Sequence, residues 1–98
     1  MSSLDGLDEP SATLRILLEL NKEKQGINIT KLYEIMKSYG VGRTAIDTSR
    51  KALTMTGLVE EYETKGRSAN FKVLSLTPLG ESVTEKIVEI EGLMNKKN

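Results

Sequence analysis

Five polar side chains between residues 43 and 51 have the spacing of one face of a helix. On a helical wheel with about 100° per residue, the same side carries Arg43, Thr44, Asp47, Thr48 and Lys51. An arginine can donate two parallel hydrogen bonds to guanine, a threonine methyl group can contact thymine, and a carboxylate can accept from the cytosine amine. The pattern therefore indicates a surface that could read base edges in the major groove of DNA.

Less specific roles for these residues remain open. Arg43 and Lys51 are also typical of a helix face that is simply exposed to water. Asp47 can accept from cytosine, or it can pair with Lys51 one helical turn later, and the sequence does not choose between the two. Arg50 lies at the edge of the same face, and we include it among the candidate DNA contacts.

A second basic segment, Lys65–Asn70, is expected to form the tip of a β-hairpin. It is polar, contains a turn-forming glycine, and carries Lys65 and Arg67 between two strand-like stretches. Cations at such a tip can reach phosphate groups. The other interpretation is an ordinary solvated turn, and three glutamates between residues 60 and 63 argue against a broad basic footprint.

The distribution of charge is more informative than its total. The 98 residues carry no net charge, which by itself argues against a nucleic-acid partner. Residues 22–51 have a net charge of +4 (seven Lys and Arg against three Asp and Glu), and residues 65–72 have +3. Residues 1–21 and 58–64 each have −3. The two basic segments can act together only if the fold brings them onto one surface.

Composition argues against several other functions. The chain has no Cys and no His, so thiol chemistry, His-dependent catalysis and the common zinc sites are excluded. Gly40 and Gly42 lie between two expected helices and do not follow a strand, unlike a dinucleotide-binding fingerprint. We therefore expect no cofactor, no metal and no enzymatic activity. Apolar runs are too short to cross a membrane, and the polar leader of residues 1–10 is unlike a signal peptide, so we expect a cytoplasmic, nucleoid-associated protein.

Two helices and a short strand are expected ahead of the polar face. Ser11 is a suitable N-cap for a first helix that ends near residues 21–24, before Gly26. Ile27 and Ile29 are β-branched, so the segment Ile27–Ile29 is expected to form a small strand. Thr30 can cap a second helix. The apolar face of this second helix consists of Leu32, Ile35, Met36 and Tyr39.

A third helix, Arg43–Thr56, is expected after the break at residues 40–42, and a hairpin with strands Leu58–Thr64 and Phe71–Leu76 follows it. The inner side of the third helix is predicted to consist of Ala45, Ile46, Ser49, Ala52, Leu53 and Thr56. The aromatic residues are expected in the core or in helix packing rather than in base stacking; they are Tyr33, Tyr39, Tyr62 and Phe71.

The last helix has a clear start and a long apolar stripe. Thr77 is expected as its N-cap and Pro78 as its first residue, and it is predicted to run to about Lys96. Its apolar residues have the spacing of a helix that packs against a partner helix. The predicted homodimer interface consists of Leu79, Val83, Ile87, Ile90, Leu93 and Met94. The alternative is that this face only covers the first helix.

Two motifs resemble winged-helix transcriptional regulators. Leu53 is followed by three residues and then Gly57-Leu58-Val59, which resembles the end of their recognition helix and the start of the first wing strand. Leu76-Thr77-Pro78-Leu79-Gly80 resembles their second wing strand running into a final helix. The overall plan is similar to MarR and ArsR regulators and to small archaeal winged-helix DNA-binding proteins.

The resemblance implies an α+β winged helix-turn-helix over residues 11–76, with a C-terminal helix over 77–98. It places the face of Arg43, Thr44, Asp47, Thr48 and Lys51 in the major groove, and it places Lys65 and Arg67 on phosphate or in the adjacent minor groove. Ser49 and Arg50 stand where the family usually has an apolar residue. The implied partner is double-stranded DNA; the alternative is a winged-helix module that binds proteins, which the zero net charge favours.

Overall fold

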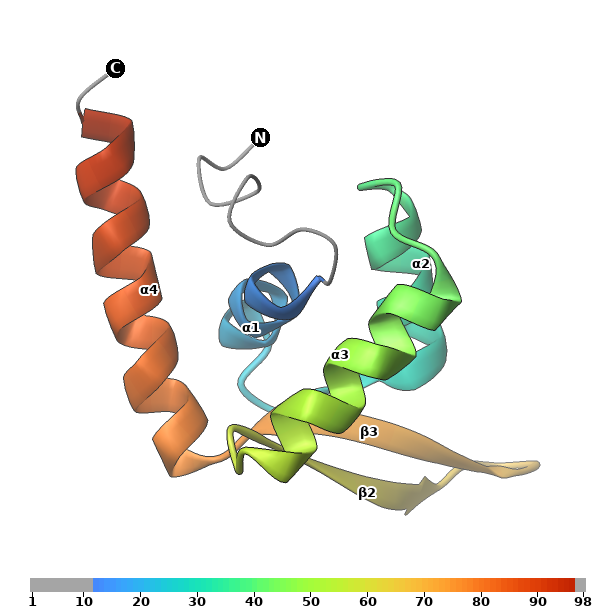
Figure 1. Cartoon of the computed structure of the whole chain (residues 1–98). Helices are drawn as coiled ribbons and strands as arrows, with labels where there is room; N and C mark the ends of the chain where they lie inside the picture. Colours follow the sequence, from blue (N-terminus) through green and yellow to red (C-terminus); the bar gives the residue numbers. More distant parts are fainter. Residues whose placement is uncertain (1–11, 97–98) are drawn as a thin grey trace.

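The computed structural model describes residues 12–96, which form an α+β domain with four helices and a three-stranded antiparallel sheet (Figure 1). The predicted leader, Ser11 and the last two residues lie outside the described part. The elements are α1 (Thr13–Lys22), β1 (Ile27–Asn28), α2 (Ile29–Lys37), α3 (Arg43–Met55), β2 (Val59–Lys65), β3 (Asn70–Leu76) and α4 (Pro78–Lys96). The expected order of helices and strands is confirmed.

The first helix lies at the centre of the domain. Ile16, Leu17 and Leu20 of α1 are fully buried, and α1 separates α4 on one side from α2 and α3 on the other (Figure 1). Gly26 ends the following turn with a φ of +99°, as its position predicted. A side chain there would also collide with Val73. The core is therefore aliphatic and organised around one helix.

Two details of α2 differ from expectation. Ile29 belongs to α2, so β1 has two residues. Asn28 caps the helix, and its Oδ1 accepts from the Thr30 backbone N–H at 2.8 Å, so Thr30 is not the cap. Asparagine is a stronger cap than threonine, and it occurs here two residues earlier. Tyr39 lies beyond the end of α2 and is 43% exposed, so it is not part of the buried face.

The sheet has the order β1-β3-β2, and most of the hairpin extends away from α4 (Figure 1). Lys65 pairs with Asn70 at the end of the ladder between β2 and β3. The predicted loop is therefore shorter than expected and contains residues 66–69. Lys65 is the last residue of β2, while Arg67 lies in the turn itself.

The inner side of α3 is narrower than predicted. Ile46, Ser49 and Leu53 are buried, whereas Ala52 and Thr56 are exposed. Ser49 lies inside because its Oγ accepts from the Ala12 backbone N–H at 3.1 Å. This bond ties the start of α1 to the middle of α3 and explains why a polar residue occupies an apolar position.

A tight junction fixes where α4 begins. Thr77 Oγ1 accepts from the Gly80 backbone N–H at 3.0 Å and donates to the Gly57 carbonyl oxygen at 2.6 Å, so the predicted N-cap is confirmed. The Thr77 backbone N–H donates to the Leu58 carbonyl oxygen at 3.1 Å. A Cβ at Gly80 would overlap that same Leu58 oxygen. Gly80, the last residue of the motif Leu76–Gly80, therefore has no side chain because α4 begins directly against the backbone of the turn before β2.

Gly80→Ala is expected to destabilise the protein by about 1–3 kcal/mol, because the added methyl group forces α4 away from Leu58. Gly92→Ala in the same helix is the matched control, since no atom lies within 4 Å of a Cβ at that position. The control should stabilise the protein by up to about 1 kcal/mol through helix propensity. Urea unfolding of both variants measures the difference, and equal effects would contradict the close approach.

Candidate functional site

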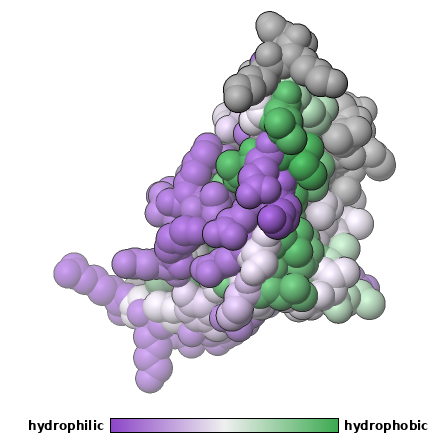
Figure 2. Space-filling model, turned by 90° about the vertical axis from the view of Figure 1, so that its left-hand side faces the viewer, coloured by the Kyte–Doolittle hydropathy of each residue, from purple (hydrophilic) through white to green (hydrophobic). Residues whose placement is uncertain are grey.

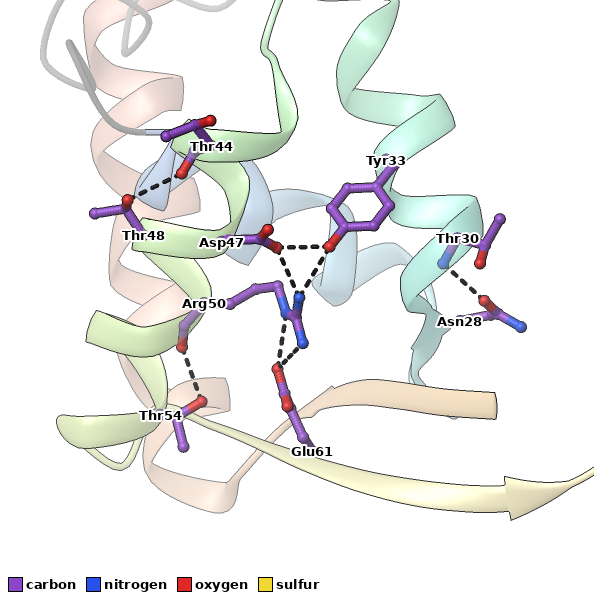
Figure 3. Close-up of polar contacts among 9 residues, drawn as sticks. All are labelled: Asn28, Thr30, Tyr33, Thr44, Asp47, Thr48, Arg50, Thr54 and Glu61. Atoms are coloured by element: carbon purple, nitrogen blue, oxygen red, sulfur yellow. Dashed lines mark hydrogen bonds and ion pairs between the residues drawn. The ribbon is translucent and has the colours of Figure 1, made fainter. Parts of the chain in front are cut away.

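Four side chains from three elements form one polar network, which we call the Arg50 network: Tyr33 of α2, Asp47 and Arg50 of α3, and Glu61 of β2 (Figure 3). The Tyr33 hydroxyl donates to Asp47 Oδ1 at 2.6 Å, and Arg50 Nη1 donates to the same oxygen at 2.7 Å. Arg50 Nε and Nη2 contact Glu61 Oε1 at 2.7 and 2.6 Å. The network holds α3 against both α2 and the hairpin.

Arg50 is the least exposed member of the three charged residues in the network. Its side chain is 14% exposed, against 27% for Glu61 and 51% for Asp47. A guanidinium that loses most of its water needs carboxylate partners, and it has two here. Arg50 was a candidate DNA contact, but its donors are directed at Asp47 and Glu61. The contacts that the structure gives Arg50 thus join α3 to α2 and to β2.

Asp47 does not form the ion pair with Lys51 that its spacing in the sequence allowed. Its partner is Arg50, three residues later. The pKa of Asp47 is lowered, chiefly because the Tyr33 hydroxyl donates to its carboxylate, with a further contribution from Arg50 that acts against the effect of partial burial. The pKa of Tyr33 is raised because Asp47 holds its hydroxyl proton and the group is partly buried. Asp47 is therefore held in its ionised form.

Tyr33 also positions a second arginine. The guanidinium carbon of Arg43 lies 4.5 Å from the centre of the Tyr33 ring, in cation–π contact. One side chain of α2 thus contacts two residues of the exposed α3 face, Arg43 through its ring and Asp47 through its hydroxyl. From the sequence we expected Tyr33 to be a packing aromatic, and nothing in its linear spacing from Asp47, fourteen residues away, signals this role.

The predicted polar face of α3 lies on the side of the helix away from the core. All five of its residues are exposed: Arg43, Thr44, Asp47, Thr48 and Lys51. The Thr48 hydroxyl donates to the Thr44 carbonyl oxygen at 2.9 Å, which fixes its rotamer. Lys51 makes no ion pair with any residue of the described chain. The face thus presents two cations, one carboxylate and short polar side chains.

The hairpin carries an exposed lysine on β3, Lys72, and near its tip it contributes the two cations predicted from the sequence, Lys65 and Arg67. Neither forms an ion pair within residues 12–96. Between α3 and β2 lies an open groove of about 330 Å³. The groove is lined by Asp47, Arg50, Lys51, Thr54, Met55 and Glu61. The candidate surface is therefore continuous from the outer face of α3 to strand β2.

Three of the four aromatic residues lie at the edges of the core and not inside it, which corrects the part of the prediction that placed them in the core. Tyr39, Tyr62 and Phe71 are 43%, 42% and 37% exposed. Tyr62 donates to the Gln25 carbonyl oxygen at 3.0 Å, and Tyr39 lies under the guanidinium of Arg15. The aliphatic core already fills the interior, so the rings cover its edges and use their polar atoms or faces for other contacts.

The apolar stripe of α4 divides into an inner and an outer part. Ile87 packs against the core, and Val83 and Met94 are half-buried. Leu79, Ile90 and Leu93 are 55%, 48% and 65% exposed. Figure 2 shows hydrophobic surface gathered in a band on the side of the molecule that carries α4. The position of α4 that is most deeply buried against the domain is Thr84, which the sequence pattern did not single out.

No family model, curated protein or solved structure matches this chain. None of the helices within residues 12–96 is long and apolar enough to cross a membrane. The same part of the chain contains no cluster of three acidic side chains suited to a metal ion. The geometry and charge of the surface are therefore the basis on which its function is assigned.

Asp47 should stabilise the fold in a pH-dependent way. Because the pKa of Asp47 is lowered in the folded protein, its contribution is fully present above the unfolded value of about 3.9 and is lost as the pH falls through the folded value. The destabilisation caused by Asp47→Asn should therefore be larger at about pH 7 than at about pH 3. Urea unfolding at a series of pH values measures it.

The hydroxyl of Tyr33 provides the matched test of this linkage. Tyr33→Phe removes the donor that contributes most to the lowered pKa of Asp47 and keeps the ring under Arg43. The loss in free energy of unfolding caused by Tyr33→Phe should also become smaller as the pH falls. A difference from the wild type that stays constant with pH in both variants would show that the network is not formed in solution.

Proposed function

We propose that this protein binds double-stranded DNA as a winged helix-turn-helix, with α3 in the major groove and the β2–β3 hairpin on the flanking backbone, and that it regulates transcription. The observation that carries the proposal is the exposed polar face of α3, from which an open groove leads to strand β2 of the hairpin. The cations Lys51, Lys65 and Arg67 make no ion pairs in the described chain, and Arg43 is exposed on α3.

The geometry of α3 supports this assignment. The major groove is about 12 Å wide and admits one α-helix, and α3 presents a face of short side chains with Arg43 at its beginning. The Arg50 network holds α3 on α2 and β2, so the reading face is fixed before DNA arrives. A rigid reading face loses less conformational entropy on binding than a mobile one.

Arg43→Ala combined with Lys51→Ala should weaken duplex binding by about tenfold or more, because a base contact and a phosphate contact are lost. The slope of log K against log salt should fall by about 0.9 for each phosphate contact removed. Fluorescence anisotropy with a labelled duplex measures both quantities. Lys24→Ala is the control for loss of positive charge, since Lys24 lies outside α3 and the hairpin and bonds to Asn21.

The absence of any duplex binding by the wild type at low salt would overturn this proposal. It would favour the second function, a winged-helix module that binds another protein, to which the zero net charge and the exposed apolar residues of α4 are suited. A selective loss of affinity in the Lys24 variant would instead place the DNA on another face.

We also propose that the protein is a homodimer that pairs through the outer stripe of α4. Leu79, Ile90 and Leu93 lie on one side of the helix and remain exposed in the single chain. Lys86 is on the same side and pairs with Glu89 at 3.6 Å, which offsets its charge within the stripe. A second copy would bury these residues and double the small number of cations available to DNA.

Ile90→Glu should convert the dimer to a monomer, because it places a carboxylate in the middle of the apolar stripe. Val88→Glu is the matched control, since Val88 is 41% exposed, similar to the 48% of Ile90, but lies on the opposite side of α4. Light scattering gives the mass of each variant. A monomeric wild type, or a dimer that survives Ile90→Glu and not Val88→Glu, would contradict this interface.

A further inference from the structure

We propose that Asp47 determines base specificity by accepting a hydrogen bond from the N4 amine of cytosine in the major groove, and that Tyr33 and Arg50 are the residues that aim it. The inference rests on the proposed DNA binding and names the base that this surface selects. It assigns a reading role to a carboxylate on a face whose other charged residues are cations.

The carboxylate of Asp47 is held by one oxygen and leaves the other for a ligand. Both the Tyr33 hydroxyl and Arg50 Nη1 donate to Oδ1. Oδ2 has no hydrogen bond to any residue of the described chain, and the side chain is 51% exposed. Figure 3 shows the two donors converging on Asp47 from the same side. Contacts within the protein thus fix the rotamer of Asp47 and leave Oδ2 available to accept a hydrogen bond.

Neighbouring charges make a carboxylate tolerable on a face that must approach phosphates. Arg50 lies between Asp47 and Glu61 and balances part of their charge. Arg43 and Lys51 stand one turn before and one turn after Asp47 on the same side of α3. The three cations outnumber the two carboxylates by one, so the repulsion between Asp47 and the DNA backbone is reduced.

The chemistry of Asp47 selects among the four bases. An ionised carboxylate only accepts hydrogen bonds. In the major groove, guanine and the O4 edge of thymine present acceptors, whereas cytosine and adenine present amines. Adenine places its own N7 acceptor beside the amine, where it repels a carboxylate, whereas the cytosine ring has a C5–H group at the corresponding position. Cytosine is therefore the base that fits Oδ2.

The arrangement also predicts the neighbourhood of the selected cytosine. Arg43, which can donate to guanine, lies four residues before Asp47. This spacing corresponds to a rise of about 6 Å along the helix. The Tyr33 ring lies under Arg43 while its hydroxyl holds Asp47. One residue of α2 thus sets the relative position of a donor for guanine and an acceptor for cytosine. The two bases should fall within about two base pairs of each other.

Selection of bound duplexes from a random pool tests the inference with the full chain. The wild type should select cytosine at one position of each half-site by about tenfold over other bases. Asp47→Asn should select adenine at that position, because an asparagine side chain pairs with the N6 and N7 of adenine. Asp47→Ala should lose the preference there and keep it elsewhere.

Tyr33→Phe and Thr48→Ala complete the design. Tyr33→Phe keeps the ring under Arg43 and removes the hydroxyl that aims Asp47, so it should weaken the cytosine preference and leave the guanine preference intact. Thr48→Ala changes the same face without touching Asp47, so the cytosine preference should persist. Circular dichroism establishes that each variant is folded, and Tyr33→Phe provides the test if Asp47→Asn is not.

The outcomes separate this inference from the function on which it rests. If the wild type binds duplex DNA but Asp47→Asn and Tyr33→Phe select the same bases as the wild type, Asp47 is only a structural residue and the inference is wrong. If the wild type selects no duplex at all, the proposed function fails and the inference fails with it. A shift from cytosine to adenine in Asp47→Asn supports both.

Discussion

Within the described residues, the guanidinium of Arg50 contacts the other three members of the Arg50 network and so joins α2, α3 and β2. It donates to Asp47 on its own helix, to the Tyr33 hydroxyl on α2 at 3.1 Å, and to Glu61 on β2. Arginine suits this position because its donors are arranged in a rigid fork that can satisfy several acceptors at once. Together with buried Leu53 and Val59 of the core, this contact holds α3 against the hairpin and supports the shape of the proposed DNA surface.

This arrangement has a consequence for the charges of the molecule. Arg50 counts toward the basic segment 22–51, yet its charge is taken up by two carboxylates. Few cations of the proposed surface are then left without an ion pair in the described part of the chain. They lie on α3 and on the hairpin. A protein with no net charge can still present a locally positive surface in this way. The small number of cations favours the proposed dimer as the species that would bind DNA.

The rest of the fold supports the surface through close backbone contacts. Ser49 holds the start of α1, and Gly80 lets α4 begin against the carbonyl oxygen of Leu58. Because these contacts occupy the inner sides of α1, α3 and α4, the outer sides of α3 and α4 remain available. The two proposed interfaces, one for DNA and one for a second copy, therefore do not compete for the same residues.

The sequence alone was enough to predict the order of the helices and strands, the cap at Thr77 and the exposed face of α3. These features depend on neighbours within one or two helical turns, and hydrophobic periodicity and capping preferences record such neighbours directly. The tertiary structure decided which charged residues are free to act. Tyr33, Arg50 and Glu61 come from three elements, and their meeting depends on how those elements pack. For the same reason Ala52 is exposed while Ser49 is buried: a helical wheel gives the angle of a residue around its own axis but not the position of the chain that packs against it.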